Sequence, residues 1–457
     1  MSLVERRSGS RLVFAALALT SSLAVAAVAT DAAQAATEQA QRVHAVGIST
    51  ETYIDTHRPT AAWGPTAAAP TRTLVTTILY PAQGSSSSGS PLAGAIPDRR
   101  GGPYPLIVFA HGLGADPELY LSLLSSWAAA GFVVAAPIFP LTGNDTPGGP
   151  DAGDVINQPG DMSFVITSVL RTSAQPGGPL SGLIDRQEIG AAGHSNGAIT
   201  TLGLVADTCC HDHRVKAAVV MAGTTEAFPG GHFDLVQAPP LLLIHGTADA
   251  LVPYSGAVAV FNAARGPKGL LSIKGGDHGS AAGLTASSAG VVQRTTTDFF
   301  EAYLRGDRAA QAGITTVGHS GVTTEHFDTN PGSRTTITTL PSPRLHLRAS
   351  ATPTTNLTNG ATLTITWTGY TAGKVVNILE CNASDLHLNS SAACSFAHAD
   401  ILTPDPTGQG HVRLEIVEGA VGNGICDTTH PSCFVVVNNA SSTAPNASVK
   451  IPISFAP

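Results

Sequence analysis

The sequence predicts an α/β protein, with a mostly parallel sheet covered by helices on both faces, followed by a small all-β sandwich. Three observations lead to this fold class. Strand-like and helix-like runs alternate between residues 106 and 304, a serine stands between two glycines at a strand-to-helix junction, and short runs rich in Thr, Val and Ile replace the alternation from Leu345 onward. Alternating elements favour a parallel sheet, and closely spaced short strands favour a sandwich.

Composition indicates a folded protein of two or three domains. The chain has 457 residues, of which 43% are hydrophobic and 12% are charged, and this balance excludes a disordered chain. The net charge of −8 is spread without long runs. Nucleic acid and an anionic membrane are therefore not expected as partners.

The first 35 residues are predicted to be a secretory signal peptide. Three arginines precede the apolar run Leu12–Val28, and the small triplet Ala33-Gln34-Ala35 follows it, as in a cleavage site. A membrane anchor is the weaker alternative, because the run is rich in alanine, is interrupted by hydroxyl residues and has no stop-transfer charges. We therefore expect a secreted protein without a membrane span, and export permits disulfides among its six cysteines.

The α/β part begins with Arg72–Tyr80, which is typical of an edge strand that leads to Pro81. Asp116–Ala130 is predicted to be a helix, with Asp116 as its cap, Pro117 in the first turn and Gly131 as its stop. The other expected strands are Leu106–Ala110, Phe132–Phe139, Glu188–Ala192, Val215–Met221, Leu241–Ile244 and Leu270–Lys274, and the other expected helices are 161–171, Asn196–Asp207 and Ala289–Leu304.

A domain boundary is expected near Pro341 and Pro343. Ser333–Arg344 is either a final strand or a linker. The catalytic domain would then span residues 36–340 and the sandwich domain residues 341–457. The expected sandwich strands are Leu363–Trp367, Lys374–Leu379, Val412–Val417, Phe434–Val437 and Val449–Phe455.

The serine between glycines, Gly193-His194-Ser195-Asn196-Gly197, has the pattern of a nucleophile elbow. A tight turn between a strand and a helix presents the serine hydroxyl at the carboxyl edge of the sheet. Side chains two residues on either side of the serine would collide with the neighbouring strand and helix, which explains the glycines.

A base and an acid follow later in the chain. Asp249 comes directly after one predicted strand and His278 after the next, and the order Ser, Asp, His is the order of α/β-hydrolases. Asp277 is a weaker candidate for the acid, because a sequence neighbour rarely points back at the imidazole ring. His194 and His111 are predicted to be structural residues that bond to the backbone beside the site.

Two backbone amides would stabilise the oxyanion. One belongs to Asn196, the residue after the nucleophile, and the other to the loop that follows the first buried strand. In that loop the Leu113 amide is the first choice and the Gly112 amide is the second.

Several motifs together resemble those of known bacterial hydrolases. The motifs are HGLGA at 111–115, NQPGDMSFVI at 157–166, GHSNGA at 193–198, TCCHDHR at 208–214 and HGTADALVP at 245–253. They resemble the platelet-activating-factor-acetylhydrolase-like and dienelactone-hydrolase-like α/β-hydrolases, which are close to cutinase-like polyester hydrolases. The resemblance covers about residues 43–331 and implies a serine carboxylesterase that uses neither a metal nor an organic cofactor.

This sequence departs from those relatives at two points. Asn196 stands where many of them have a hydrophobic residue, which leaves its backbone amide unchanged but alters the expected acyl pocket. Ser195 replaces the cysteine nucleophile of the dienelactone branch proper, which argues against that activity.

Cys209-Cys210-His211-Asp212-His213 invites comparison with a zinc site. Adjacent residues do not easily converge on one tetrahedral ion, and the usual spaced pairs of ligands are missing. A vicinal disulfide or two buried thiols are therefore favoured over a metal site.

The remaining four cysteines lie in the sandwich domain. Pairing in sequence, Cys381 with Cys394 and Cys426 with Cys433, is the simplest of three connectivities. The cysteine placement and the closing IPISF resemble the neocarzinostatin family of immunoglobulin-like sandwiches, whose members bind an enediyne chromophore. No chromophore-binding residue is recognised here, and a surface-binding, ligand-binding or spacer module is expected. The aromatic residues Trp367, Tyr370 and Phe396 are either exposed ligand contacts or, with greater weight, core residues.

These observations predict a secreted serine carboxylic-ester hydrolase that acts on a small-molecule, lipid or polymer ester. Ser195 would be the nucleophile, His278 the base and Asp249 the acid. A binding protein with a vestigial hydrolase domain and an amidase or peptidase with the same triad remain alternatives.

Overall fold

The computed structural model describes residues 44–84, 90–249, 251–317, 322–337, 347–370, 376–382, 394–402, 407–421, 424–430, 433–439 and 448–457. The predicted signal peptide and the predicted boundary at residue 340 lie outside these ranges. They therefore stay predictions.

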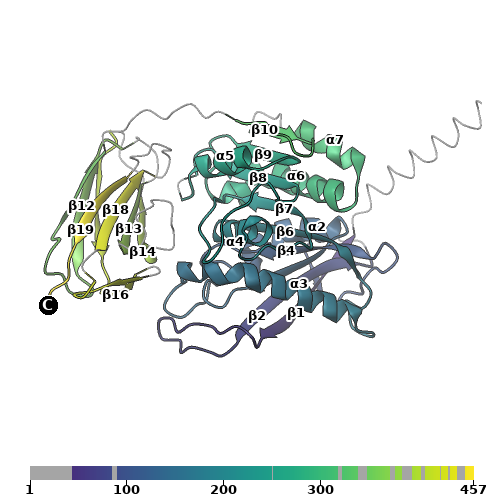
Figure 1. The fold of residues 1–457 in the computed structure, drawn as a ribbon, viewed down its shortest axis with the longest axis horizontal. Coiled ribbons are helices and arrows are strands. Elements are labelled where there is room, and N and C mark those ends of the chain that lie inside the picture. Colours follow the sequence, from purple (N-terminus) through teal and green to yellow (C-terminus); the bar gives the residue numbers. More distant parts are fainter. Residues whose placement is uncertain are drawn as a thin grey trace, which may run out of the picture.

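One ten-stranded sheet organises the α/β part of the chain, in the order β10-β9-β8-β7-β6-β4-β5-β2-β1-β3 (Figure 1). Its strands from β4 to β9 run parallel to their neighbours, whereas β1, β2 and β10 join antiparallel at the two sides. The strands are β1 (Ala45–Asp55), β2 (Arg72–Ala82), β3 (Leu92–Ala93), β4 (Tyr104–Ala110), β5 (Val133–Ile138), β6 (Ile184–His194), β7 (Val215–Met221), β8 (Leu241–Gly246), β9 (Lys268–Ile273) and β10 (Thr323–Asp328).

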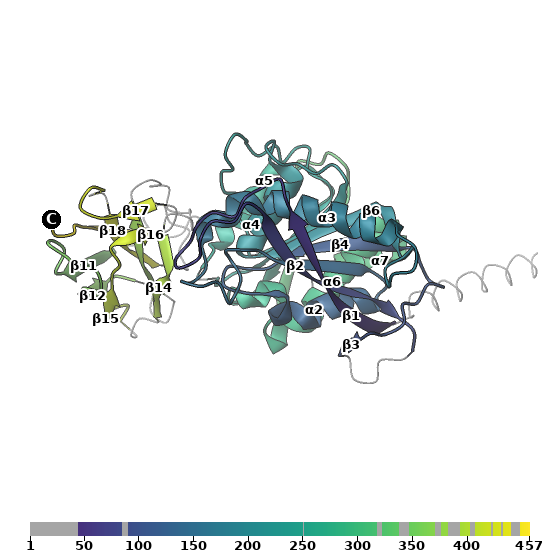
Figure 2. The same ribbon diagram turned by 90° about the horizontal axis from the view of Figure 1, so that it is seen from below.

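Helices cover both faces of this sheet (Figure 2). One apolar core joins the sheet to α3, α4 and α5, and a second core on the opposite face joins it to α2, α6 and α7. The helices are η1 (Pro117–Tyr120), α2 (Leu121–Ala129), η2 (Ala152–Asn157), α3 (Gln158–Ala174), α4 (Asn196–Ala206), α5 (Tyr254–Ala263), η3 (Gly279–Ala282), α6 (Ala286–Leu304) and α7 (Arg308–Val317).

The central strands are apolar because they are buried on both faces. All seven residues of β4 are buried, as are those of β8 and β9. Apart from the buried His245, Lys268 and Ser272, these strands consist of apolar residues and glycine, as expected for strands with helices above and below them. The predicted α/β class is confirmed.

The prediction that Arg72–Tyr80 forms an edge strand is wrong, because β2 lies between β5 and β1. β1 pairs with β2 along its whole length, but Gly47 and the polar residues after it weaken its alternation in sequence. The strand β1 was therefore not predicted from the sequence. The helices α5 and α7 and the strand β10 were not predicted either.

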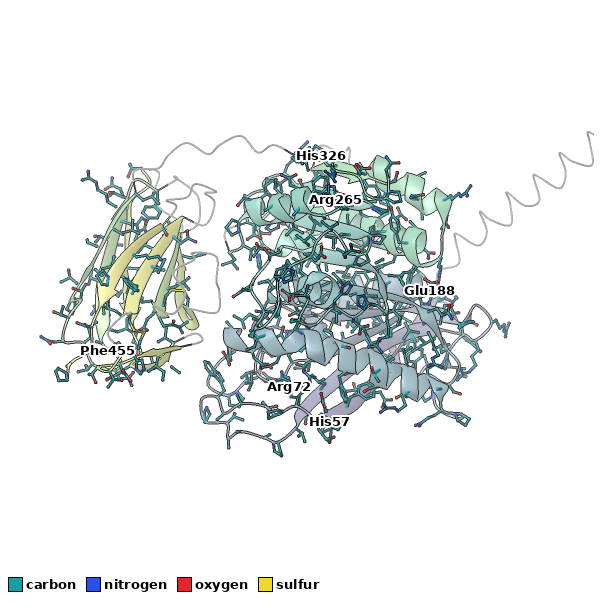
Figure 3. All side chains as sticks on the ribbon, viewed as in Figure 1. His57, Arg72, Glu188, Arg265, His326 and Phe455 are labelled. Atoms are coloured by element: carbon teal, nitrogen blue, oxygen red, sulfur yellow. A yellow bond between two sulfur atoms is a disulfide. The ribbon has the colours of Figure 1, made fainter. Side chains whose placement is uncertain are left out.

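A buried ion cluster fixes the start of α3. Arg72, which is labelled in Figure 3, stands at the beginning of β2 and is fully buried. It pairs with Asp154 and Asp161, each at 2.7 Å. Arg58 adds a second contact to Asp161 at 2.7 Å. Removing one partner of such a cluster would leave a buried charge, which typically costs about 3–5 kcal/mol. The first turn of α3 is therefore held firmly against β2.

The C-terminal part consists of antiparallel sheets that enclose a core of their own. Side chains of β12, β13, β15 and β18 pack together in that core, which confirms the predicted sandwich. The sheets have the orders β11-β12-β15, β14-β13-β18-β19 and β16-β17. The strands are β11 (Arg348–Thr352), β12 (Thr362–Thr368), β13 (Val376–Asn382), β14 (Cys394–Leu402), β15 (Gly410–Glu415), β16 (Gly419–Val421), β17 (Gly424–Cys426), β18 (Cys433–Asn439) and β19 (Ser448–Ile453).

The sandwich core contains Trp367 and Tyr370, which are 2% and 4% exposed. The Tyr370 hydroxyl donates a hydrogen bond to the carbonyl of Val437 at 2.9 Å. These two aromatic residues are core residues and not exposed ligand contacts. The side chain of Phe396 lies outside the described part.

Disulfides join Cys381 to Cys394 and Cys426 to Cys433, which is the sequential arrangement. Among the described residues, no helix is both long and apolar enough to cross a membrane.

Candidate active site

Ser195 occupies the turn between β6 and α4. Its φ of 59° and ψ of −121° lie outside the common regions for a residue with a side chain, and holding such a conformation costs about 1–3 kcal/mol. A Cβ on Gly193 would come within 2.1 Å of the carbonyl oxygen of Gly197, and a Cβ on Gly197 within 2.1 Å of that of Ala110. Only glycine fits at either position, so the sequence motif is a steric requirement of the turn.

His278 and Asp249 meet at this serine. The Nε2 atom of His278 lies 2.8 Å from Ser195 Oγ, and its Nδ1 atom lies 2.8 Å from an Asp249 carboxylate oxygen. Asp249 follows β8 and His278 follows β9. Neighbouring parallel strands end at the same edge of the sheet. For this reason three residues that are far apart in the sequence lie within hydrogen-bond distance of one another.

Asp249 is saturated with hydrogen-bond donors. One carboxylate oxygen accepts from the amides of Leu251 and Val252 at 2.9 and 3.0 Å, and the other lies 2.8 Å from His278 and 3.1 Å from His245. Burial by itself would raise the pKa of Asp249, but the hydrogen bonds from the two histidines outweigh it and hold the pKa below its usual range. The group is therefore a carboxylate at neutral pH.

Asp277, the weaker candidate for the acid, has other partners. Its carboxylate accepts from the backbone amide of Ser280 at 2.9 Å and from the Ser280 hydroxyl at 2.6 Å. It thereby stabilises the η3 turn that follows His278.

The loop after β4 lies against the serine, because a Cβ on Gly112 would be 3.3 Å from Ser195 Cβ. Two amides of this loop are already used. Gly112 donates to the Tyr120 hydroxyl at 3.2 Å, and Gly114 donates to the carbonyl of Thr142 at 2.9 Å. The Leu113 amide has no acceptor among the described residues. This arrangement favours Leu113 over Gly112 as an oxyanion donor.

The second predicted donor is the amide of Asn196, the first residue of α4. The first amides of a helix lack an intrahelical acceptor, and the helix dipole places positive charge at this end. The Asn196 side chain is 5% exposed, and neither of its polar atoms has a partner in the described part of the chain. Leaving a buried polar group unpaired costs about 1–3 kcal/mol. The side-chain amide of Asn196 therefore destabilises the fold relative to a hydrophobic residue at this position.

His194 and His111 bond to backbone beside the site, as a structural role requires. His194 Nε2 lies 3.0 Å from the carbonyl of His278 and must donate to it, so His194 Nδ1 accepts from the Tyr120 hydroxyl at 3.0 Å. His111 contacts the Gly112 carbonyl at 2.7 Å. Burial, together with the nearby His278, lowers the pKa of His194 to about 3, and burial lowers the pKa of His111 to about 4. Both rings are neutral at physiological pH.

Two supporting residues were missed by the sequence analysis. Tyr120 joins the loop at Gly112 to His194, and His245 contacts the acid Asp249. His245 stands in the recognised HGTAD motif, so its place beside the acid could have been suspected. No local pattern marks Tyr120.

The cysteine pair at 209–210 forms a vicinal disulfide. Asp207, Cys209 and Cys210 have potential ligand atoms within 4.8 Å of one another, but both sulfurs are used in the disulfide. In this state the group offers no thiolate ligand to a metal.

The chain matches two family models. Residues 349–455 match the neocarzinostatin family, and residues 64–139 match platelet-activating factor acetylhydrolase, isoform II. Both of these resemblances, expected from the sequence, are confirmed. The acetylhydrolase match includes the loop at Leu113 and supports an ester hydrolase in general terms.

The curated proteins and the solved structures were also compared with this chain. No curated protein matches. A ferulic acid esterase from Streptomyces cinnamoneus is similar among solved structures, with 22% identity over 59% of this chain and 92% of that chain and a TM-score of 0.43. The neocarzinostatin match and the disulfides are consistent with an extracellular protein.

Proposed function

We propose that the protein is a secreted serine carboxylic-ester hydrolase. The observation that carries this proposal is the pair of 2.8 Å contacts that join Ser195 to His278 and His278 to Asp249. A serine hydroxyl is a weak nucleophile until a base accepts its proton, and the base needs a partner that fixes its tautomer.

Acylation begins when His278 Nε2 takes the Ser195 proton and Oγ attacks the ester carbonyl carbon. The carbonyl π electrons move to oxygen, and the Leu113 and Asn196 amides donate hydrogen bonds to that oxyanion. Asp249 accepts from Nδ1 and stabilises the imidazolium. The oxyanion then collapses, the bond to the leaving alkoxide breaks, and His278 protonates the departing oxygen, which leaves an acyl-enzyme.

Deacylation repeats these steps with water. His278 takes a proton from water, the hydroxide oxygen attacks the acyl carbon, and the second tetrahedral intermediate releases a carboxylic acid while His278 returns its proton to Ser195 Oγ. The donors of the oxyanion hole are worth about 3–4 kcal/mol each in enzymes of this type.

The decisive experiment compares wild type with Ser195→Ala on a short-chain 4-nitrophenyl ester. Wild type should turn over and react with a fluorophosphonate probe at Ser195, whereas the folded variant should do neither. Absence of labelling in folded wild type would favour the vestigial, binding-protein alternative. Faster cleavage of the matching 4-nitroanilide would favour the amidase alternative.

Secretion and surface binding are separate parts of the proposal. Mass spectrometry of protein recovered from the medium should find a mature N-terminus close to residue 36. Deleting residues 341–457 should lower the adsorption of the protein to a solid polyester film but leave hydrolysis of a soluble ester intact. Unchanged adsorption would assign the sandwich domain another role.

A further inference from the structure

Gln158, the first residue of α3, has a buried polar side chain that takes no part in the candidate triad. Its side chain is 0% exposed, although the first turn of a surface helix commonly faces solvent. Burying an amide is unfavourable unless both of its ends are hydrogen-bonded. Gln158 meets that condition through two threonines from two different elements.

One end of the Gln158 amide reaches the loop after β5. Its Nε2 donates to Thr142 Oγ1 at 2.8 Å, and the carbonyl of the same threonine accepts the Gly114 amide at 2.9 Å. Gly114 is the neighbour of Leu113, the proposed first oxyanion donor. Gln158 therefore contacts the residue that fixes one side of the oxyanion hole.

The other end reaches α4. Thr200 Oγ1 lies 2.5 Å from Gln158 Oε1 and 3.1 Å from the carbonyl oxygen of Asn196. Asn196 carries the proposed second oxyanion donor. Thr142 and Thr200 are both 0% exposed, so water does not compete for these contacts.

The position of Gln158 is also fixed by contacts of its neighbours in the first turn of α3. Arg58 donates to the carbonyl of Asn157 at 3.1 Å, and a Cβ on Gly160 would come within 2.6 Å of the Arg58 guanidinium. The buried Arg72 cluster holds Asp161 in the same turn. The first turn of α3 therefore cannot shift to follow either threonine.

We propose that Gln158 is a positioning residue of the oxyanion hole, which sets the separation between the Leu113 and Asn196 amides by tying Thr142 to Thr200. This inference rests on the proposed function. The Tyr120 hydroxyl also joins the loop after β4 to the elbow, but it does so at Gly112 and His194, whereas the Gln158 bridge acts beside Gly114 and Asn196. A displacement of about 1 Å in such a donor can cost about a hundredfold in rate.

The test is the near-isosteric variant Gln158→Met, which keeps the volume and removes both hydrogen bonds. We expect kcat on the 4-nitrophenyl ester to fall about tenfold to a hundredfold, with KM within about twofold, because the oxyanion exists only in the transition state. Affinity for a boronic acid that forms a tetrahedral adduct on Ser195 should fall by the same factor. Affinity for the carboxylate product, which is planar, should not change.

Ser173→Ala is the matched control. Ser173 is a buried polar residue near the other end of α3, and its hydroxyl donates to the carbonyl of Leu180 at 2.9 Å. Its loss should reduce stability and leave kcat unchanged. Equal losses of kcat in Ser173→Ala and Gln158→Met would overturn the proposal, since general loosening of α3 would then explain both.

Thr142→Val keeps the proposal testable if Gln158→Met does not fold. This variant removes only the hydroxyl and retains the carbonyl that binds Gly114, and it should lower kcat in the same direction. Because both changes remove one shared contact, the double variant should be no slower than Gln158→Met. Unchanged kcat in Thr142→Val, or multiplied losses in the double variant, would overturn the inference, while labelling of wild-type Ser195 by the fluorophosphonate would still support the proposed function.

Discussion

Removing the Tyr120 hydroxyl tests the buried contacts that connect the loop after β4 to the elbow. Tyr120→Phe is nearly isosteric, but it leaves the Gly112 amide without its acceptor and His194 Nδ1 without its donor. Each buried group left unpaired costs about 1–3 kcal/mol. With partial relaxation we expect the free energy of unfolding to fall by about 2–4 kcal/mol, which lowers Tm by about 3–6 °C in a domain of about 300 residues.

Urea denaturation of the full chain, followed by tryptophan fluorescence and activity, measures this loss. We also expect kcat to fall more than KM rises, because Gly112 adjoins the donor Leu113. The control is Tyr80→Phe, which removes one hydrogen bond to the carbonyl of Ala95 at 2.9 Å, made by an equally buried tyrosine. A stability of Tyr120→Phe within about 0.5 kcal/mol of wild type would refute the reasoning, since that is the range of a neutral substitution.

Three further variants test charges. Asp249→Asn should lower kcat about 10⁴-fold by favouring the wrong tautomer of His278, whereas Asp277→Asn should retain activity; the opposite result in steady-state assays would make Asp277 the acid. In the sandwich domain, burial raises the pKa of the fully buried Glu380 from 4.5 to about 7, so the folded state keeps a proton that the unfolded state releases. Stability is then fully present below pH 4.5 and declines by about 3 kcal/mol as the pH rises to about 7. Glu380→Gln should remove this decline in denaturation curves measured at pH 4.5 and 7, and a variant that retains it would contradict the assignment.

Much of the catalytic part could be predicted because its signals are local. β4, β7 and β8 are largely apolar runs, with Lys216 as the one exposed residue of β7, and such runs indicate burial on both faces. Asp116 and Pro117 marked a helix start correctly, although the first turn is the separate 3₁₀ helix η1. The candidate triad was found for the same reason, since each member stands at the end of a strand or in the loop that follows it.

The predictions failed for elements whose sequence pattern depends on the strands or helices that pack against them. The first half of β2 alternates between buried and more exposed residues, as an edge strand would, yet β1 pairs with β2 along its full length. α5 has little polar contrast between its faces, and β10 joins the sheet only as the antiparallel partner of β9. Neither property can be read from a short window of residues.

By itself, the sequence determined which residues are able to carry acyl transfer, because a serine between two glycines at a strand-to-helix junction is a local pattern and the candidate acid and base follow later strands in the order Ser, Asp, His. Only the tertiary structure decided how these residues are supported. It directs the Gly112 amide to Tyr120 and leaves the Leu113 amide without an acceptor in the described part of the chain. It also adds His245 to the Asp249 carboxylate and places Gln158 between two threonines. These contacts join elements that are distant in the chain, and their hydrogen bonds depend on angles and distances of a few tenths of an ångström, which no periodicity or motif encodes.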